Sequence, residues 1–428
     1  MAERPVGELA AGEADALARD AADPLAGYRE RFLLPIGPAG DPAIYLAGQS
    51  LVLQPKAAQG AIEVELAAWS RLGVDAWFDP ARSWFTFTDR LREPMARVVG
   101  ARPSEIAVLN ALTVNIHLLL ASFFRPEGRR RRILADGPLF PSDRHALTSH
   151  LHQRGLDPAV DLVVVEPRDG SSTVPASDLE AAIAEHADEL ALVWLAGVKF
   201  ATGQAHEIER LTAAGRAAGA LVGWDLAHAA GNIELSLHDW DVDFAAWCTY
   251  KYLNGGPGSV GAIFVHDRHG QDPATRRLGG WWGIDPDRRF EMVETFEPAK
   301  GAAGWEASTP PVLAMAPLAA SLAIFDEVGM PALRAKSIEL TGYLAGLLEA
   351  LPVETITPRE TAARGAQLSL RFDEATAVLS ALAARGVIAD FRAPDIIRVA
   401  PIPLYTTFHE VWRFARLLDE VLRGPEPA

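Results

Sequence analysis

Short apolar runs alternate with helical stretches between residues 105 and 265, and this alternation constrains the fold of the 428-residue chain more than any other feature. Such runs are typical of strands in a mostly parallel sheet that helices cover on both faces. Strands are expected at 106–110, 132–136, 162–166, 190–196, 220–225, 244–248 and 262–266, and helices at 114–124, 143–154, 177–187 and 206–218. Ser142 and Ser177 are the expected caps of two of these helices. The sequence therefore predicts an α/β domain.

The sequence changes character after Pro310 and Pro311. A long helical region is expected at 312–349, followed by strand-like segments at 368–372 and 396–401 with a helix between them. This mixture is typical of a smaller α+β domain. We therefore expect an N-terminal arm that packs on the small domain, residues 1–60, a large α/β domain, residues 61–311, and a small C-terminal α+β domain, residues 312–428.

Composition excludes several classes of protein. The formal net charge of -16 argues against a nucleic-acid surface, because neutralising phosphates requires clustered Lys and Arg. We interpret the one basic run, Arg129 to Arg132, as the solvated start of a strand. The single Cys248 excludes an intramolecular disulfide and a multi-cysteine metal site. No stretch reaches the roughly 18 apolar residues that span a bilayer, and no signal peptide is evident. We expect a soluble cytoplasmic protein with no nucleic-acid or membrane partner.

Polar residues that the apolar pattern does not explain stand at the expected carboxyl ends of the strands, where ligands bind in open α/β sheets. Thr113 lies in NALTVN, residues 110–115, where a strand passes into an apolar helix. Free backbone N–H groups and the helix dipole make such a helix start an anion site, to which the Thr113 hydroxyl could contribute. The simpler interpretation, that Thr113 only caps the helix, stays open at this point.

Two further strand ends carry chemically useful residues. Asp225 and His228 are three residues apart and share one face, but two ligands are too few for a metal site, and a strand-end Asp is often only a helix cap. Lys251 follows the strand 244–248 in a chain with five lysines and 35 arginines. Among basic side chains only lysine forms a Schiff base. Lys199 also follows a strand, and a lysine at a strand end can simply extend to solvent.

Arg398 interrupts the apolar segment IIRVAP, residues 396–401. A buried arginine needs an anion, either an internal carboxylate or that of a substrate, and the residues alone do not decide between them. Taken together, an anion cradle, an Asp, a Lys and a carboxylate-binding Arg in this order are what a pyridoxal-phosphate (PLP) enzyme acting on an amino acid requires.

Longer segments resemble the kynureninases in order and spacing from about residue 30 onward. They are YLAGQSLVLQPK (45–56), NALTVN (110–115), FPSD (140–143), WDLAHAAGNIELSLHDWDVDFAAWCTYKYLNGGPG (224–258), GGWWG (279–283), STPP (308–311) and IIRVAPIPLY (396–405). The resemblance implies an aminotransferase-like fold, PLP as cofactor and a homodimer with shared active sites. It also implies hydrolysis of the Cβ–Cγ bond of L-kynurenine, with 3-hydroxykynurenine as a further candidate substrate. The products would be anthranilate and L-alanine, in tryptophan degradation and the NAD biosynthesis that it supplies.

Carried over residue by residue, the resemblance assigns roles to single positions. In this fold the Asp precedes the lysine, so the resemblance selects Lys251 over Lys199 as the lysine that would hold the cofactor. Asp225 would pair with the pyridine nitrogen and Tyr250 would relay a proton. The remaining cofactor-binding positions would be Leu112, Thr113, Phe140, Asp143, His228, Trp281 and Thr309, and the substrate-binding positions Ser50, Trp77, Ser308 and Arg398. Phe140 would stack on the cofactor ring, Arg398 would bind the substrate carboxylate, Ser50 and Trp77 would lie near the aryl ring, and Ser308 and Thr309 would act across the dimer interface. No metal is implied.

The sequence departs from the family at Gln49, where Asn is usual, and at Val52, where Gly is usual. These positions border the substrate end in the family, so they bear on the aryl group rather than on the reaction. Trp77 sits among Phe78, Trp84 and Phe85, so a core role is an alternative for it.

Two other functions are weighed. A cysteine desulfurase or selenocysteine lyase needs a cysteine on a loop, whereas Cys248 falls in an expected strand. A PLP-binding protein without turnover would not need Asp225, Lys251 and Arg398 together.

Overall fold

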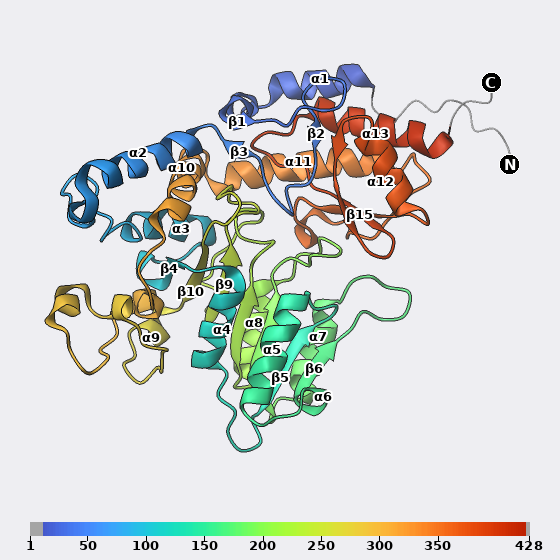
Figure 1. The fold of residues 1–428 in the computed structure, drawn as a ribbon. Coiled ribbons are helices and arrows are strands. Elements are labelled where there is room, and N and C mark those ends of the chain that lie inside the picture. Colours follow the sequence, from blue (N-terminus) through green and yellow to red (C-terminus); the bar gives the residue numbers. More distant parts are fainter. Residues whose placement is uncertain (1–11, 425–428) are drawn as a thin grey trace. The chain divides into compact units, whose positions relative to one another are not determined.

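The computed structural model describes residues 12–424, which divide into two compact units (Figure 1). The large unit comprises residues 57–198 and 206–329. The small unit comprises the described chain up to Lys56, the segment Lys199–Ala205 and the chain from Met330 onward. These limits differ from the expected division in three places. Residues 57–60 and residues 312–329 belong to the large unit, and a short segment after Val198 belongs to the small one.

A seven-stranded sheet forms the centre of the large unit, in the order β4-β10-β9-β8-β7-β5-β6. The strands are β4 (Ile106–Leu109), β5 (Arg132–Asp136), β6 (Leu162–Val165), β7 (Leu190–Ala196), β8 (Leu221–Asp225), β9 (Phe244–Cys248) and β10 (Gly261–Val265). The pairs from β6 to β9 are parallel, whereas β10 is antiparallel to both of its neighbours. The expected mostly parallel α/β sheet is confirmed, and each strand lies within one residue of its predicted position.

Helices cover both faces of this sheet. The face that bears Leu192 and Trp194 packs against α4 (Leu112–Phe123) and α5 (Pro141–Gln153). On the opposite face, α8 (Ile208–Ala217) approaches so closely that a Cβ at Gly215 would lie 2.5 Å from a methyl group of Val222. The other helices of the unit are α2 (Ala57–Leu72), α3 (Asp89–Val99), α6 (Pro158–Asp161), α7 (Ala176–Glu185), α9 (Asp267–Gly270) and α10 (Val312–Val328), with the 3₁₀ helices η2 (Gly73–Trp77), η3 (Pro103–Glu105), η4 (Trp281–Gly283), η5 (Pro286–Glu291) and η6 (Gly301–Trp305).

The predicted helix caps are wrong. Helix α5 begins at Pro141 and α7 begins directly after Pro175, so Ser142 and Ser177 lie inside the first turn. A proline near the first helical position has its φ already set for the helix, and this moves each start ahead of the serine. The interpretation of Thr113 as a cap is also wrong, because Ala111 occupies that position in α4.

The long helical region expected at 312–349 is two helices, α10 and α11 (Met330–Leu348), bent by 84° at Gly329. Gly329 has a φ of 78°, in the region that favours glycine, and this ends α10. No single helix in the described chain is long and apolar enough to cross a membrane. Only the bent pair meets that test, on length and composition alone.

The small unit is an α+β structure. Its four-stranded antiparallel sheet has the order β11-β12-β15-β14, and its core joins apolar residues of that sheet to helices α1, α11 and α13. The N-terminal segment contributes β2, which pairs with β13, and the pair β1–β3. The elements not yet given are α1 (Glu13–Ala22), η1 (Ala26–Arg31), β1 (Phe32–Leu33), β2 (Ile44–Tyr45), β3 (Gln54–Pro55), β11 (Glu354–Thr355), η7 (Thr361–Ala363), β12 (Leu368–Arg371), α12 (Ala375–Ala383), β13 (Val387–Ile388), β14 (Asp390–Arg392), β15 (Ile396–Val399) and α13 (Phe408–Arg423).

Candidate active site

Lys251 lies just beyond the carboxyl end of β9 and is 9% exposed. Its Nζ is 3.1 Å from Nε2 of His228. The same Nζ lies 5.9 Å from the centre of the Phe140 ring and 5.8 Å from the centre of the Tyr250 ring. Three other predicted site residues therefore lie around the buried Lys251 amine, and the four residues come from three separate segments.

Asp225 ends β8, the parallel neighbour of β9, so its carboxylate lies at the same edge of the sheet as Lys251. Its Oδ1 accepts a hydrogen bond from the backbone N–H of Ala227 at 2.8 Å. Residues 227–232 form turns and no helix follows directly. The interpretation of Asp225 as a helix cap is therefore wrong, and the turn explains how His228 comes back to the lysine.

Asp143 lies on α5 and is buried, and its Oδ1 accepts a 2.9 Å hydrogen bond from the indole N–H of Trp194. Burial raises the pKa of Asp143 well above its usual range, and the negative charges of Asp225 and Asp136 raise it further. The site thus contains two carboxyl groups in different surroundings: Asp143 is buried and its pKa is raised, while Asp225 lies partly exposed at the strand end. Trp194, which holds Asp143, was not among the predicted site residues.

Tyr250 and Cys248 form a pair beside the lysine. Burial raises the pKa of the Tyr250 phenol, and a hydrogen bond to Cys248 acts in the same direction. Burial also raises the pKa of the Cys248 thiol, while the charge of Lys251 acts against this. Both groups therefore keep their protons near neutral pH, so Tyr250 can donate a hydrogen bond.

The start of α4 supplies backbone donors. Leu112 and Thr113 are its first two residues, where N–H groups have no partner within the helix. The Thr113 side chain is exposed, and its hydroxyl makes no hydrogen bond within residues 12–424. Phe140, just ahead of α5, is 39% exposed, so part of its ring is open for stacking. An open aromatic ring, helix N–H groups, a carboxylate and a buried amine fit the parts of PLP.

Arg398 lies in the small unit on β15 and is 1% exposed. Its guanidinium donates to Asp390 Oδ2 at 2.6 Å and to the carbonyl of Phe200 at 2.7 Å. The terminal nitrogen that contacts Asp390 also donates to Ser50 Oγ at 3.0 Å, and the Ser50 hydroxyl in turn donates to Asp390. An internal carboxylate therefore accompanies Arg398, and the contacts of the Ser50 hydroxyl are with this ion pair.

Asp390 was missed by sequence reasoning. It is the cross-strand partner of Arg398, since β14 and β15 pair antiparallel. A signal existed, because a charged residue eight positions before Arg398 can face it across a hairpin, but the turn between them was not recognised.

The two departures from the family are buried in the small unit. Gln49 donates to the backbone carbonyl of Arg398 at 3.3 Å, and Val52 packs in the core. Gln49 therefore acts on the strand that carries Arg398. Lys199, the rival lysine, is also buried and belongs to the small unit, whereas Lys251 belongs to the large one.

Trp77 and Trp281 belong to a partly exposed aromatic group. The Trp77 ring lies 5.6 Å from Trp84 and 5.7 Å from Trp282, and it lines a cavity of about 420 Å³ with Trp69. Trp77 is half-buried, and both its role near the aryl ring and the alternative core role stay predictions. The Trp281 indole N–H donates to the carbonyl of Arg289 at 2.9 Å, so in this arrangement it is already bonded.

Ser308 and Thr309 follow η6 in an exposed loop. Neither hydroxyl makes a hydrogen bond with any residue of the described chain. No hydrogen bond within the described chain therefore links them to the site around Lys251, and their predicted role across a dimer stays a prediction.

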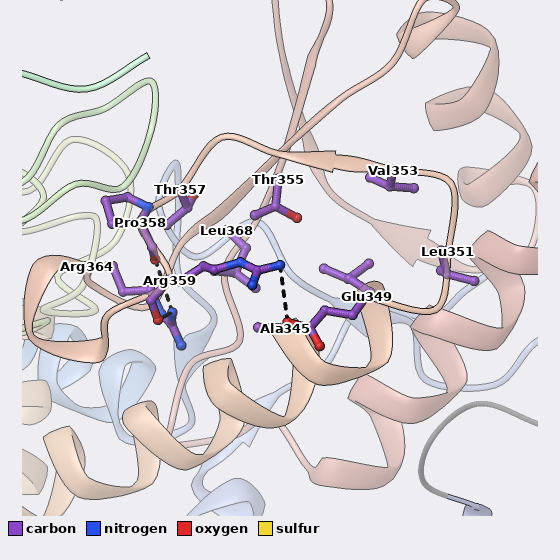
Figure 2. A pocket seen from close by; sticks show the side chains of 11 residues that line it. Ala345, Glu349, Leu351, Val353, Thr355, Thr357, Pro358, Arg359, Arg364 and Leu368 are labelled. Atoms are coloured by element: carbon purple, nitrogen blue, oxygen red, sulfur yellow. Dashed lines mark hydrogen bonds and ion pairs between the residues drawn. The ribbon is translucent and has the colours of Figure 1, made fainter. Parts of the chain in front are cut away.

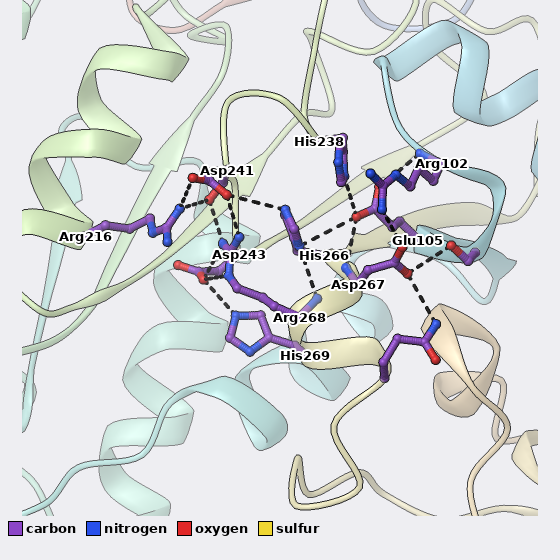
Figure 3. Close-up of polar contacts among 12 residues, drawn as sticks. Arg102, Glu105, Arg216, His238, Asp241, Asp243, His266, Asp267, Arg268 and His269 are labelled. Atoms are coloured by element: carbon purple, nitrogen blue, oxygen red, sulfur yellow. Dashed lines mark hydrogen bonds and ion pairs between the residues drawn. The ribbon is translucent and has the colours of Figure 1, made fainter.

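A second polar cluster lies at the amino ends of β4 and β9, the edge of the sheet opposite Asp225 (Figure 3). One ligand atom from each of Glu105, His238 and His266 lies within 4.8 Å of the other two. The Glu105 carboxylate, however, already accepts from His238 at 2.8 Å and from the backbone N–H groups of Arg102 and Asp267, both at 2.9 Å. With its acceptors occupied, Glu105 acts as a structural link.

The sheet order, the Asp at the end of β8 and the buried Lys after β9 define a PLP-dependent enzyme of fold type I. Solved structures of this class have the same fold. The cystine C-S lyase C-DES, in a variant with glycine linked to its PLP cofactor, has a TM-score of 0.74 at 20% identity, covering 91% of this chain and 99% of its own. The apo cysteine desulfurase from Thermococcus onnurineus NA1 has a TM-score of 0.71 at 18% identity, covering 90% and 95%.

Within this class the chain belongs to the kynureninase family. It is 49% identical to a kynureninase of Salinispora tropica over 96% of this chain and 97% of the relative, and 48% identical to one of Myxococcus xanthus over 94% and 95%. The model of the kynureninase C-terminal domain matches residues 333–418.

Proposed function

We propose that this chain hydrolyses the Cβ–Cγ bond of L-kynurenine, giving anthranilate and L-alanine. The observation that carries the proposal is the buried Lys251 amine, 3.1 Å from His228 and at the same sheet edge as Asp225, in a chain of the kynureninase family. When bound, PLP supplies an electron sink that makes negative charge at the substrate's carbons tolerable.

Lys251 is the covalent attachment point and the group that moves the α-proton. The amine is buried, which limits competition from water, and His228 Nε2 is placed to accept its hydrogen bond when the imidazole carries its proton on Nδ1. His228 thereby orients the amine toward the face of Phe140.

Asp225 would supply the negative charge that favours a protonated pyridine nitrogen when PLP is bound. An opposite charge at hydrogen-bond distance shifts a pKa by about one to three units toward the charged form. Asp143, held by Trp194 and favouring its protonated form, adds a hydrogen-bond donor without a second full charge. Tyr250, whose raised pKa keeps its proton in place, is suited to donate a hydrogen bond to a developing oxyanion.

Arg398 is the proposed partner of the substrate carboxylate. Its planar fork matches a carboxylate, and Asp390, Ser50 and Phe200 fix its orientation before substrate binds. Because Arg398 already binds Asp390, a substrate carboxylate would either share the guanidinium with the Asp390 carboxylate or replace it there.

Cysteine desulfurase activity is the second function within this fold. Its chemistry requires a mobile thiolate, but Cys248 is the last residue of β9, is buried and has a raised pKa. These properties favour kynureninase activity.

The test is to incubate the PLP-loaded protein with L-kynurenine and to measure anthranilate by fluorescence and L-alanine by chromatography. Equal amounts of both are expected, and Cys248→Ser should retain this activity. Sulfide released from cysteine would instead indicate a desulfurase, and PLP binding without turnover a binding protein. A parallel assay with 3-hydroxykynurenine measures the aryl preference.

A homodimer and a cytoplasmic location are parts of the same proposal. The exposed rings of Phe78 and Phe290 lie 5.9 Å apart, and the exposed Trp69 lines a cavity with Pro310 and Pro311, which directly follow Thr309. Large exposed apolar surfaces mark interfaces. The single buried cysteine is compatible with a reducing compartment. Light scattering tests the dimer and cell fractionation the location.

A further inference from the structure

Arg364 in the small unit is a buried cation without a bonded anion. It lies between η7 and β12 and is 2% exposed. Its NH1 group donates to the backbone carbonyls of Pro358, at 3.1 Å, and Arg359. Its Nε has no acceptor, and no carboxylate of the described chain forms an ion pair with it.

Burying a guanidinium with neutral partners alone costs free energy, because carbonyls replace the hydration shell but not the counter-charge. The carboxylate of Glu360 acts on Arg364 only from a distance, since its exposed side chain makes no hydrogen bond with it. Burial accordingly lowers the pKa of Arg364. A position that keeps such a cation is suited to receive an anion from outside.

Arg364 lines a pocket of about 370 Å³ between the end of α11 and β11, a volume within the range of small-molecule sites (Figure 2). The apolar part of its lining comes from Ala345, Leu348, Leu351, Val353 and Leu368. Figure 2 shows the Arg359 side chain extended across the pocket to Glu349, a 3.4 Å ion pair between two exposed groups. Exposed pairs of this kind contribute little, about 0–1 kcal/mol, so Arg359 is free to turn to a ligand.

The wall around Arg364 is rigid. Its backbone carbonyl accepts a 2.9 Å hydrogen bond from Arg334, and Gly365 N–H donates to Gly203 at 3.1 Å. Thr357, on the same wall, accepts from the backbone N–H of Ser369 at 2.8 Å. Fixed walls reduce the ordering that a ligand must impose on its site.

We propose that this pocket binds a small organic monocarboxylate, with its carboxylate on Arg364 and Arg359 and its apolar body against Ala345, Leu348 and Val353. The two arginines specify an anion, and the apolar lining favours an organic anion over inorganic phosphate. The site belongs to the small unit alone and does not depend on the proposed reaction.

The test is equilibrium dialysis of benzoate against the PLP-loaded protein. Because benzoate could also bind where a substrate carboxylate does, binding is measured in wild type and in Arg398→Ala. A saturable site should remain in Arg398→Ala. In that background Ala345→Phe, which fills the pocket, and Arg364→Gln should each weaken benzoate binding about tenfold or more, while Arg359→Gln weakens it less.

The matched control is Arg385→Gln, an exposed arginine of the same unit outside the pocket, which should bind benzoate unchanged. Benzamide, which has the same shape without the charge, should not compete, and phosphate should compete only weakly. Circular dichroism identifies any variant that is misfolded, and Ala345→Phe tests the site independently of Arg364. Loss of all saturable binding in Arg398→Ala, binding unchanged by Ala345→Phe, or equal competition by benzamide or phosphate would overturn the proposal.

Discussion

At the scale of single residues, the site places two carboxyl groups in different surroundings. Asp225 lies partly exposed at the strand end, whereas Asp143 is buried and has a raised pKa. The raised pKa of Asp143 comes from burial and from neighbouring negative charges rather than from residue type.

Replacing Lys251 with Ala should remove the yellow colour of the lysine-bound cofactor and lower turnover on the order of 10³-fold or more, the scale of loss when a covalent catalytic group is removed. Absorbance spectra and the anthranilate assay measure both. Lys199→Ala is the matched control, since Lys199 is also buried and also follows a strand. If Lys199→Ala loses the colour instead, the cofactor is attached to Lys199 and the assignment to Lys251 is wrong.

Replacing Arg398 with Ala should weaken substrate capture while leaving the cofactor spectrum unchanged. Removing one partner of a buried charge pair costs about 2 to 5 kcal/mol, which corresponds to a fall in kcat/KM of roughly thirtyfold to several-thousandfold. Arg398→Lys should recover only part, because an ammonium lacks the planar fork.

Arg392→Gln is the control for Arg398, because Arg392 contacts the same Asp390, at 3.2 Å, but is partly exposed. It should change kcat/KM only a few-fold. If Arg398→Ala unfolds the protein or releases PLP, Arg398 is a structural partner of Asp390 and the carboxylate site lies elsewhere.

Asp143→Asn should change how stability depends on pH. The folded-state pKa of Asp143 lies above the unfolded value of about 3.9, so its contribution is complete below that pH and is lost as pH rises through the folded-state pKa. Asn keeps an acceptor for Trp194 and does not ionise. The stability of Asp143→Asn relative to wild type should therefore increase with pH, by about 1.4 kcal/mol per unit of pKa elevation. Urea unfolding of the cofactor-free proteins measures this, and a difference independent of pH would contradict it.

At the scale of elements, each helix start depends on local chemistry that differs from case to case. Helices α5 and α7 start at or after prolines, whereas α13 has a capping box in which Thr407 accepts from Glu410 N–H at 3.0 Å and Glu410 accepts from Thr407 N–H at 3.1 Å. The buried face of α13 packs in the core of the small unit.

Thr407→Ala should therefore destabilise the protein by about 0.5–2 kcal/mol, because an N–H group at the helix start loses its acceptor. Thermal unfolding of the holoenzyme measures the effect. Arg416→Ala, which removes an exposed pair with Glu420 on the same helix, should cost at most about 0.5 kcal/mol. Equal effects of the two changes would show that the capping box contributes nothing specific.

At the scale of the whole molecule, the proposed dimer predicts complementation between inactive variants. Thr309→Glu places a negative charge where the family places the neighbour's phosphate, and Lys251→Ala removes the attachment point. If sites are shared, a mixed dimer regains one intact site, and random mixing should restore about a quarter of wild-type activity. Activity that stays absent after unfolding and refolding the two variants together would argue that each chain completes its own site.

The sequence was sufficient for the sheet and for the position of the lysine. Apolar runs of strand length predict each strand from the local pattern alone, and parallel strands place their carboxyl ends at one edge. Asp225 and Lys251 could therefore be assigned to the same edge without knowledge of side-chain packing. The predicted helix caps were wrong because neighbouring prolines, not the serines, set the helix starts. The break at Gly329 was not predicted because helical periodicity continues on both sides of it.

By itself, then, the sequence determined the fold class, the family and the order of the chemical groups, since these follow from local patterns and motifs along the chain. Only the tertiary structure decided that Arg398 is paired with Asp390 and oriented by Phe200 and Ser50, and that Arg364 is buried without a bonded anion. The physical reason is that the state of a buried charge depends on which groups surround it. Those groups come from strands and loops up to 348 residues away along the chain.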